Sequence, residues 1–583
     1  MPAALTDFVP ADIDASRWPN VEPLFEELAT RQVSSREEFE RWLLDRSELE
    51  AACSEAGARL YIDMTCNTED EALEQKYLAF VREVEPKLKP AGFRLDRRQV
   101  ELEDTFGLDP ERYLVLGRDT RSEVELFRDE NVPIQTELSE LAQKQQKLTG
   151  AMTVEFDGRE QTLPQMARYQ ESTDRAVREG AWRAVAERRL RDRDAIDEIY
   201  DRMVEKRTRL ARNAGFENYV GYAFKAKKRF DYTPAHCAAF HDAVEREVMP
   251  FAARLDERRR ALLGVDELRP WDVAVDPKGR PPLRPFENGV DLVSKTRRVF
   301  DRLDPSPGGL GEMFAGMGDG SNDKGIAAGA LLDLDSRRGK APGGYQYMQD
   351  RSRRPFIFMN AAGLHRDVET MVHEAGHAFH SMLCVDEPLL HYRHAPIEFA
   401  EVASMSMELL TMPYWDAYYP DAEDLARARR RQLEGSVVLL AWIATIDAFQ
   451  HWVYSNPGHT REERTAEWLR LGERFGDAGH RVSWEGLEPY RRTVWQRQGH
   501  LFGAPFYYIE YGIAQLGALG LWLKSLEEGE QAAVAAYKRA MSLGGSKPLP
   551  ELFAAAGLEF DFGAGTVGRI VRAVEAELDK LPD

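Results

Sequence analysis

Apolar residues recur three and four positions apart through most of the chain, which is the spacing of helices that bury one face. Ser35 followed by Glu38 resembles a capping box at the start of one such run. The pattern predicts helices over residues 35–56, 68–85, 131–149, 162–214 and 234–263, and helix again from about residue 364 to the end of the chain.

Alternating patterns are short and few. Residues 152–163 alternate around Asp157-Gly158, which is a strong hairpin signal. Further strands are predicted over residues 331–335, 343–349 and 355–360. The fold class is therefore mainly α, with a small β-sheet immediately before the helix that begins near residue 364.

Two segments break the helical pattern. Residues 270–285 contain five prolines and are predicted to be a connector. The glycine-rich residues 306–323 have no lysine at the spacing of a phosphate-binding loop, so we interpret them as a flexible loop and not a nucleotide site. With 583 residues, the chain exceeds the size of a single core. We expect an N-terminal helical lobe with a small hairpin over residues 1–200 and a second domain over residues 201–583.

Charge and composition limit the classes of binding partner and the cellular compartment that we expect. The net charge of −21 predicts a surface that binds neither nucleic acid nor anionic membranes. Four cysteines without a CxxC pair are typical of a reducing compartment, and the first twenty residues lack the pattern of a signal peptide. The longest apolar run, residues 436–454, contains Asp447, Gln450 and His451 and is predicted to be a buried helix. We expect a cytoplasmic protein.

The segment His373-Glu374-Ala-Gly-His377 carries the chemistry of the chain. On a helix, positions i and i+4 lie on one face, so two imidazoles at this spacing can bind one zinc ion. Glu374 lies about 100° further round the helix, where a carboxylate can reach a water on the metal without binding the metal itself. The alternative is a helix with two histidines that are solvated or satisfied in the core. The apolar positions around the motif favour the metal site, because buried histidines need partners.

A catalytic zinc normally has three protein ligands and one open position. The predicted helix over residues 397–410 offers Glu398, Glu401 and Glu408, of which Glu401 lies in mid-helix between apolar residues. We therefore expect Glu401 to be the third ligand. Glu369 and Glu408 are candidates for orienting the imidazoles, and His380 is expected to pack.

Three segments resemble the M3 metallopeptidases, the group of thimet oligopeptidase and oligoendopeptidase F. They are Pro355-Phe-Ile-Phe-Met-Asn360, Glu398-Phe-Ala-Glu401-Val-Ala-Ser404 and His500-Leu-Phe-Gly-Ala-Pro-Phe-Tyr-Tyr-Ile-Glu-Tyr511-Gly512, together with the His373 motif. The third fits the oligoendopeptidase F branch particularly well, and the resemblance covers about residues 120 to 580. It implies a two-lobed helical bowl around a deep channel, with the catalytic domain over residues 201–583.

The resemblance also implies a zinc-dependent endopeptidase that hydrolyses short unstructured oligopeptides. It assigns one zinc per chain to His373, His377 and Glu401, and the role of general base to Glu374. It places a histidine and tyrosines across the cleft, which correspond to His500, Tyr508 and Tyr511. The spacing from histidine to tyrosine is one residue shorter than in the thimet branch, so Tyr507 remains an alternative to Tyr508 and Tyr511.

In the expected mechanism, Glu374 activates the water and a tyrosine hydroxyl stabilises the oxyanion, assisted by His500. The strand edge at Gly343, Gly344 and Tyr345 is expected to bind an extended oligopeptide. Three other functions remain open. The chain could be a helical metallocarboxypeptidase with the same motif, a scaffold with structural zinc, or a peptide-binding module without turnover.

Overall fold

The computed structural model describes residues 6–318 and 331–582. The first helices are α1 (Trp18–Thr30), α2 (Arg36–Cys66), α3 (Glu71–Glu83), α4 (Glu85–Phe106), α5 (Pro110–Leu126), α6 (Asn131–Gly150), α7 (Ala167–Gln170), α8 (Arg175–Arg191) and α9 (Arg193–Asn213). The middle helices are α10 (Tyr219–Ala226), α11 (Pro234–Ala243), the π-helical η2 (Val244–Val248), α12 (Met249–Leu263), α13 (Gly289–Leu303) and α14 (Leu310–Ala315).

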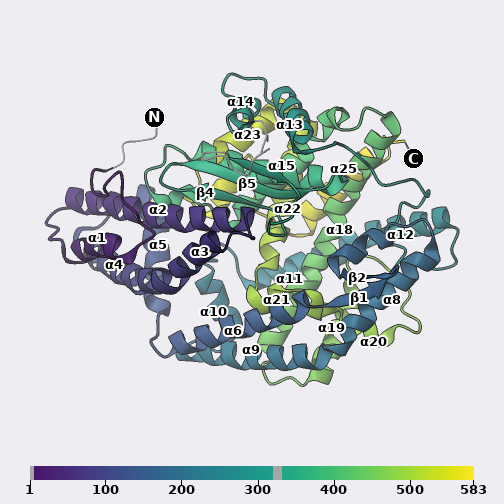
Figure 1. Ribbon diagram of the computed structural model, residues 1–583, viewed down its shortest axis with the longest axis horizontal. Helices are drawn as coiled ribbons and strands as arrows, with labels where there is room; N and C mark the ends of the chain where they lie inside the picture. Colours follow the sequence, from purple (N-terminus) through teal and green to yellow (C-terminus); the bar gives the residue numbers. More distant parts are fainter. Residues whose placement is uncertain (1–5, 319–330, 583) are drawn as a thin grey trace.

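The carboxyl-terminal part of the chain is also helical. Its helices are α15 (His365–Leu383), α16 (Leu390–Arg393), α17 (Ile397–Leu410), α18 (Ala422–Ser455), α19 (Arg461–Phe475), α20 (Glu488–Arg491), α21 (His500–Gly503), α22 (Tyr508–Glu528), α23 (Glu530–Met541), α24 (Leu549–Ala555) and α25 (Ala564–Leu578). Short 3-10 turns are η1 (Pro164–Met166), η3 (Met412–Ala417) and η4 (Val494–Arg497). The predicted mainly helical class is confirmed, and Figure 1 shows α15, α18 and α22 near the middle of the molecule.

Helices α1 to α5 form the N-terminal end of the molecule and have a core of their own (Figure 1). The Ser35 hydroxyl accepts the backbone N–H of Glu38, as the sequence predicts. The predicted end of this helix near Ala56 is wrong, because α2 continues to Cys66. Its last turns carry Ile62 and Cys66, which pack against the central sheet and so remain buried.

The predicted hairpin over residues 152–163 is confirmed as β1 (Thr153–Phe156) and β2 (Arg159–Thr162). Asp157 and Gly158 both have positive φ, which the two-residue turn requires. The single helix predicted over residues 162–214 is wrong. The chain turns at Pro164, and Asp174 caps a new helix, α8, by accepting the backbone N–H of Ala176. Local polar caps therefore interrupt a run that its apolar spacing predicts to be continuous.

The three strands predicted after residue 330 are present and form the central sheet in the order β3 (Leu332–Asp335), β5 (Arg354–Ala361) and β4 (Tyr345–Gln349). Strand β3 is parallel to β5, whereas β4 is antiparallel to it and lies at the edge. Phe356 and Phe358 of β5 pack against α2, and α15 follows β5 directly and lies against the sheet. The predicted glycine-rich loop contains α14, and its residues 319–323 lie outside the described residues.

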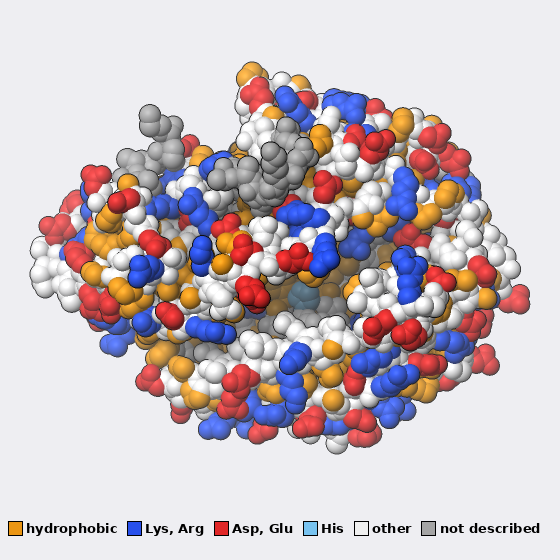
Figure 2. Space-filling view, viewed as in Figure 1, with side chains coloured by type: hydrophobic (Ala, Val, Ile, Leu, Met, Phe, Trp, Pro, Cys, Tyr) orange, Lys and Arg blue, Asp and Glu red, His pale blue; other side chains and the backbone are white. Residues whose placement is uncertain are grey.

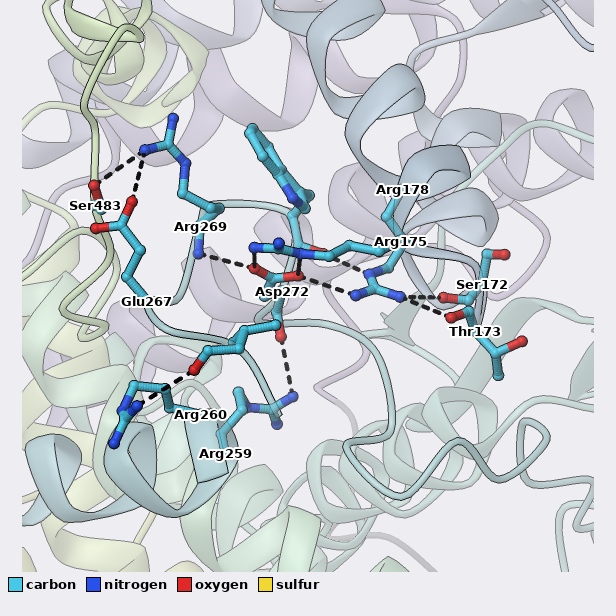
Figure 3. A network of polar contacts seen from close by, with 12 residues as sticks. Ser172, Thr173, Arg175, Arg178, Arg259, Arg260, Glu267, Arg269, Asp272 and Ser483 are labelled. Carbon is cyan, nitrogen blue, oxygen red and sulfur yellow. Dashed lines mark hydrogen bonds and ion pairs between the residues drawn. The ribbon is translucent and has the colours of Figure 1, made fainter. Parts of the chain in front are cut away.

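A buried carboxylate fixes the connector predicted from prolines (Figure 3). Asp272 is fully buried and accepts hydrogen bonds from Arg175 and Arg178 of α8 and from the backbone of Arg269. Arg269 in turn binds Ser483, which follows α19. The start of the connector is therefore bound to α8 through Asp272 and to the segment after α19 through Arg269. The predicted division at residue 200 falls within α9 and stays a prediction.

Helix α18 contains the apolar run over residues 436–454. By length and composition it is able to cross a membrane, but 72% of its most apolar stretch is buried inside the protein. Its burial agrees with the prediction of a core helix.

Candidate metal centre and catalytic cleft

His373 and His377 lie one turn apart on α15 and face Glu401 of α17. Oε2 of Glu401 is 3.4 Å from Nε2 of His373 and 3.6 Å from Nε2 of His377. Two ligands at about 2.0–2.1 Å from a tetrahedral zinc are about 3.3–3.4 Å apart, so the three side chains fit this metal. The structure thus brings together the three residues that the sequence selects.

A glycine inside the motif allows α15 and α17 to approach closely. A Cβ atom on Gly376 would lie 2.5 Å from the carbonyl oxygen of Ala403 and 2.6 Å from Cα of Ser404. These are backbone atoms, which cannot yield without moving α17. Glu401 reaches the histidines because the residue between the two helices has no side chain.

Glu408 is the carboxylate that orients a motif histidine. Its Oε1 is 2.7 Å from Nδ1 of His373, and Gln432 of α18 donates to its other oxygen. Burial disfavours the imidazolium form of His373, but the hydrogen bond and charge of Glu408, with the nearby glutamates, raise the pKa of His373 to about 9. Glu369, the other candidate, contacts His365 instead, at 3.2 Å. This arrangement occupies Nδ1 of His373 and directs Nε2 toward Glu401, where a metal ion would displace the Nε2 proton.

Glu374 is buried on the rim of the histidine pair, with 8% of its surface exposed. Burial raises the pKa of Glu374 to about 7, and the backbone amide of Gln346 on β4 lowers it in part. A carboxyl group with a pKa near neutrality can both accept and return a proton. The predicted base therefore lies between the histidines and the edge strand. His380 is buried, as expected of a packed residue.

His500 and three tyrosines form an aromatic cluster at the start of α22. The ring of His500 lies 5.1 Å from that of Tyr508 and 6.1 Å from that of Tyr511, and Nδ1 of His500 contacts Gln498. The hydroxyl of Tyr508 contacts Trp442 and Gln498. Burial and the charge of Glu401 raise the pKa of Tyr511 to about 12, so its hydroxyl keeps its proton beside the metal ligands.

Tyr507 forms a hydrogen bond with Tyr511 and is also close enough to Glu401 to sense its charge. The electrostatic environment thus links Tyr511 and Tyr507 to the metal ligands, whereas the contacts of Tyr508 are with Trp442 and Gln498. The choice among the three tyrosines stays a prediction.

Sequence analysis did not identify Arg229, which supports the loop between α21 and α22, residues 504–507. Arg229 is buried and donates to Glu510 at 2.8 Å, to the carbonyl of Phe506, and lies 3.8 Å from Glu398. Phe506 has a φ of 62° and donates its N–H to Gln450. The sequence contains one signal for this arginine. Glu398 and Glu510 each occur in an apolar run, and buried carboxylates of this kind require a buried cation.

A hollow opens on the face of the molecule shown in Figure 2, and a histidine side chain is visible at its floor. The predicted peptide-binding residues lie where edge strand β4 begins. Gly343 and Gly344 precede the strand, and Tyr345 is its first residue. The side chain of Tyr345 does not point to the metal ligands, since its hydroxyl contacts Thr65 of α2 and its ring stacks on Phe358. Gly343, Gly344 and Tyr345 line a cavity of about 770 Å³ with Tyr61 and other aromatic residues.

Known proteins share this architecture. The profile of Peptidase family M3 matches residues 168–567. The solved structure of PZ peptidase A with inhibitor 2 superposes with a TM-score of 0.84 at 29% identity, covering 98% of this chain and 99% of that chain. A protein provisionally named oligoendopeptidase F superposes with a TM-score of 0.83 at 30% identity, covering 98% of both chains.

A relative found by sequence is also described as related to oligoendopeptidase F. The oligoendopeptidase F homolog of Borreliella burgdorferi is 24% identical over 313 residues, which are 52% of this chain and 49% of that relative. This match spans about half the length of the relative, whereas the family profile covers more than half of the present chain. The chain belongs to peptidase family M3.

Proposed function

We propose that the protein is a zinc-dependent endopeptidase that hydrolyses short, unstructured oligopeptides. The observation that carries this proposal is the group of His373, His377 and Glu401 with the buried carboxyl of Glu374 beside it. We assign one zinc ion to this group. A site with three ligands and an adjacent base is suited to catalysis, because a purely structural zinc has four protein ligands and no use for a base.

When bound, zinc would supply Lewis-acid activation of water and of the scissile carbonyl. Glu374 takes a proton from the attacking water and delivers it to the leaving amine. A hydroxyl of the tyrosine cluster, from Tyr511 or Tyr508, donates to the developing oxyanion. His500, held by Gln498, assists from the same side of the cleft. Burial lowers the pKa of His500, so at neutral pH it acts as an uncharged donor.

The substrate would bind as an extended strand along β4. An edge strand offers unpaired backbone groups to a peptide, and the amide of Gln346 on this strand faces Glu374. A Cβ atom on Gly344 would be in ordinary van der Waals contact with the carbonyl oxygen of Phe358 at 3.4 Å and the methyl of Thr370 at 3.5 Å, so the fold itself would accept it, whereas the two further methyl groups of a valine would crowd a peptide backbone bound at this edge. Gly344→Val should therefore raise KM about tenfold, which corresponds to about 1.4 kcal/mol. An unchanged KM for a quenched oligopeptide would rule out binding at this edge.

The decisive variant is Glu374→Gln, which keeps the shape of the side chain and removes the base. We expect it to retain zinc and to lose hydrolysis of a quenched oligopeptide by at least about 10²–10⁴-fold. Glu369→Gln is the matched control, since Glu369 lies one turn earlier on α15 and contacts His365. Turnover by Glu374→Gln at the rate of the unmodified protein would overturn the mechanism.

A peptide blocked at both ends separates the proposed activity from the carboxypeptidase alternative. An endopeptidase cleaves it internally, whereas a carboxypeptidase requires a free terminal carboxylate. Binding of the blocked peptide without cleavage would instead identify a peptide-binding module. We expect internal cleavage that stops when a chelator removes the metal.

A further inference from the structure

A second group of side chains of the kinds that ligate metals lies between α11 and α18 and shares no residue with the group of His373, His377 and Glu401. Cys237 and His241 are four residues apart on α11, and Asp447 and His451 are four residues apart on α18. Each pair therefore lies on one face of its helix, and the two helices pack together. Four side chains of ligand type thus meet in the core.

The ligand atoms are close enough for one ion. An Sγ of Cys237, a carboxylate oxygen of Asp447 and a ring nitrogen of His451 all lie within 4.8 Å of one another. Nε2 of His451 is 3.4 Å from Oδ2 of Asp447, about the separation of two ligands on a tetrahedral zinc. Nε2 of His241 is 2.9 Å from the same Oδ2 and holds the carboxylate in place.

The group is buried and incompletely hydrogen-bonded. Cys237 and Asp447 are both 0% exposed. Among the described residues, Oδ1 of Asp447 has no hydrogen-bond partner, and Nε2 of His451 has only its 3.4 Å contact with Oδ2 of Asp447, which is too long for a good hydrogen bond. An unpaired buried polar atom costs about 1–3 kcal/mol, so these two atoms indicate a missing partner.

We propose that Cys237, Asp447 and His451 bind a divalent cation of borderline softness, with zinc as the best match, and that His241 completes or orients the site. Thiolate, carboxylate and imidazole are the ligands zinc prefers, whereas calcium and magnesium require oxygen. Binding converts the Cys237 thiol to a thiolate and releases one proton to solvent. The thiolate and the carboxylate then carry two negative charges, which the dication neutralises in the buried site.

The proposed ion lies next to the loop that precedes α22 and contains Phe506 and Tyr507. The ring of His451 packs 5.1 Å from that of Phe506, and the neighbouring Gln450 accepts the N–H of Phe506. An ion that fixes Asp447 and His451 would therefore hold this part of α18 against the loop. We assign the site a structural role, because it is buried between the two helices and its four side chains of ligand type can complete a tetrahedral shell without an open position.

Cobalt substitution tests the site on the unmodified chain. The first metal centre has only nitrogen and oxygen ligands, so a thiolate-to-cobalt charge-transfer absorption in the near ultraviolet can come only from a cysteine site. We expect this absorption in the cobalt-loaded protein, and two metal ions per chain by elemental analysis of the zinc-loaded protein. A metal content of one ion per chain without charge-transfer absorption would overturn the proposal.

Variants assign the two ions. Cys237→Ala and His451→Gln should each lower the metal content from two ions to one and abolish the charge-transfer absorption. His373→Ala should also lower the content to one but keep the absorption, which separates this proposal from the proposed catalytic zinc. Cys384→Ala is the matched control, because Cys384 is a buried thiol outside the group. If the absorption survives in Cys237→Ala, the ligand is another thiol and the proposed site is wrong.

Discussion

At the scale of single residues, the carboxylate of Glu408 determines how His373 is presented. Its hydrogen bond to Nδ1 fixes the ring and directs Nε2 toward Glu401. We expect Glu408→Ala to weaken metal binding at the first centre about 10–100-fold, the usual effect of removing such a partner. Competition with a chromogenic chelator measures this affinity. Glu369→Ala should leave it unchanged, and equal affinities in the two variants would contradict the orienting role.

Residue spacing, together with the resemblance to the M3 metallopeptidases, was sufficient to predict that His373, His377 and Glu401 meet, but not which residues support them. His373 and His377 follow from helical periodicity, and Glu401 follows from the need for a third ligand on a nearby helix. Whether Glu369 or Glu408 faces His373 depends on the packing of α17 against α15, which the sequence does not encode as a local pattern. The tyrosines are harder still, because Phe506 adopts a left-handed conformation that redirects the chain just before them.

At the scale of elements, strands and hairpin turns were predictable because their signals are local. Asp157-Gly158 defines the hairpin, and short alternating runs define the sheet. Helix ends were less predictable. Polar caps such as Asp174 interrupt a continuous apolar pattern, whereas α2 extends past its apparent end because Ile62 and Cys66 are buried by a sheet that lies far away in the sequence.

Arg229 joins α17, which carries Glu401, to α22, which carries Tyr508 and Tyr511. It contacts Glu398 of α17 and Glu510 of α22, and burial together with the charge of Glu510 raises the pKa of Glu398. Replacing Arg229 by Met leaves the buried Glu398 without its cation and Glu510 with Lys227 alone, which should lower the free energy of unfolding by about 3–5 kcal/mol. Denaturant unfolding measures the loss.

Two comparisons make the Arg229 prediction specific. Lys225→Met removes a cation whose partner Glu125 lies at the surface, so its effect should stay below about 1 kcal/mol. Adding Glu398→Gln to Arg229→Met removes the uncompensated charge and should recover part of the lost stability. If Arg229→Met is no more destabilising than Lys225→Met, the arginine does not join the helices as described.

At the scale of the whole molecule, the helical class and the position of the small sheet were predictable, since they depend on periodicity summed over long segments. The contacts that assemble the helices were not. Arg178 and Asp272 are 94 residues apart, and Arg269 and Ser483 are 214 residues apart. Each residue alone has the sequence features of a solvated charge or a loop residue, so only the assembled structure identifies them as a cross-link between distant segments (Figure 3).

This cross-link predicts a specific dependence of stability on pH. Burial of Asp272 favours its neutral form, but hydrogen bonds from Arg175, Arg269 and Arg178 outweigh burial and lower its pKa in the folded protein. A lowered folded-state pKa stabilises the fold above the unfolded value of about 3.9, and this contribution is lost as the pH falls through the folded-state pKa. Asp272→Asn should therefore cost about 3–5 kcal/mol at neutral pH, and this cost should shrink as the pH falls below the unfolded-state value of about 3.9 and vanish once the pH is below the folded-state pKa.

Denaturant unfolding of both proteins across this pH range measures the difference. Glu267→Gln is the matched control, because Glu267 lies just before the connector and its carboxylate, which pairs with Arg269, is exposed. Its effect should remain below about 1 kcal/mol at every pH. A loss of stability in Asp272→Asn that stays constant as the solution becomes acidic would show that the side chain acts through its shape. A loss that declines below the unfolded-state pKa and disappears below the folded-state pKa requires that the charge of Asp272 joins the connector to α8.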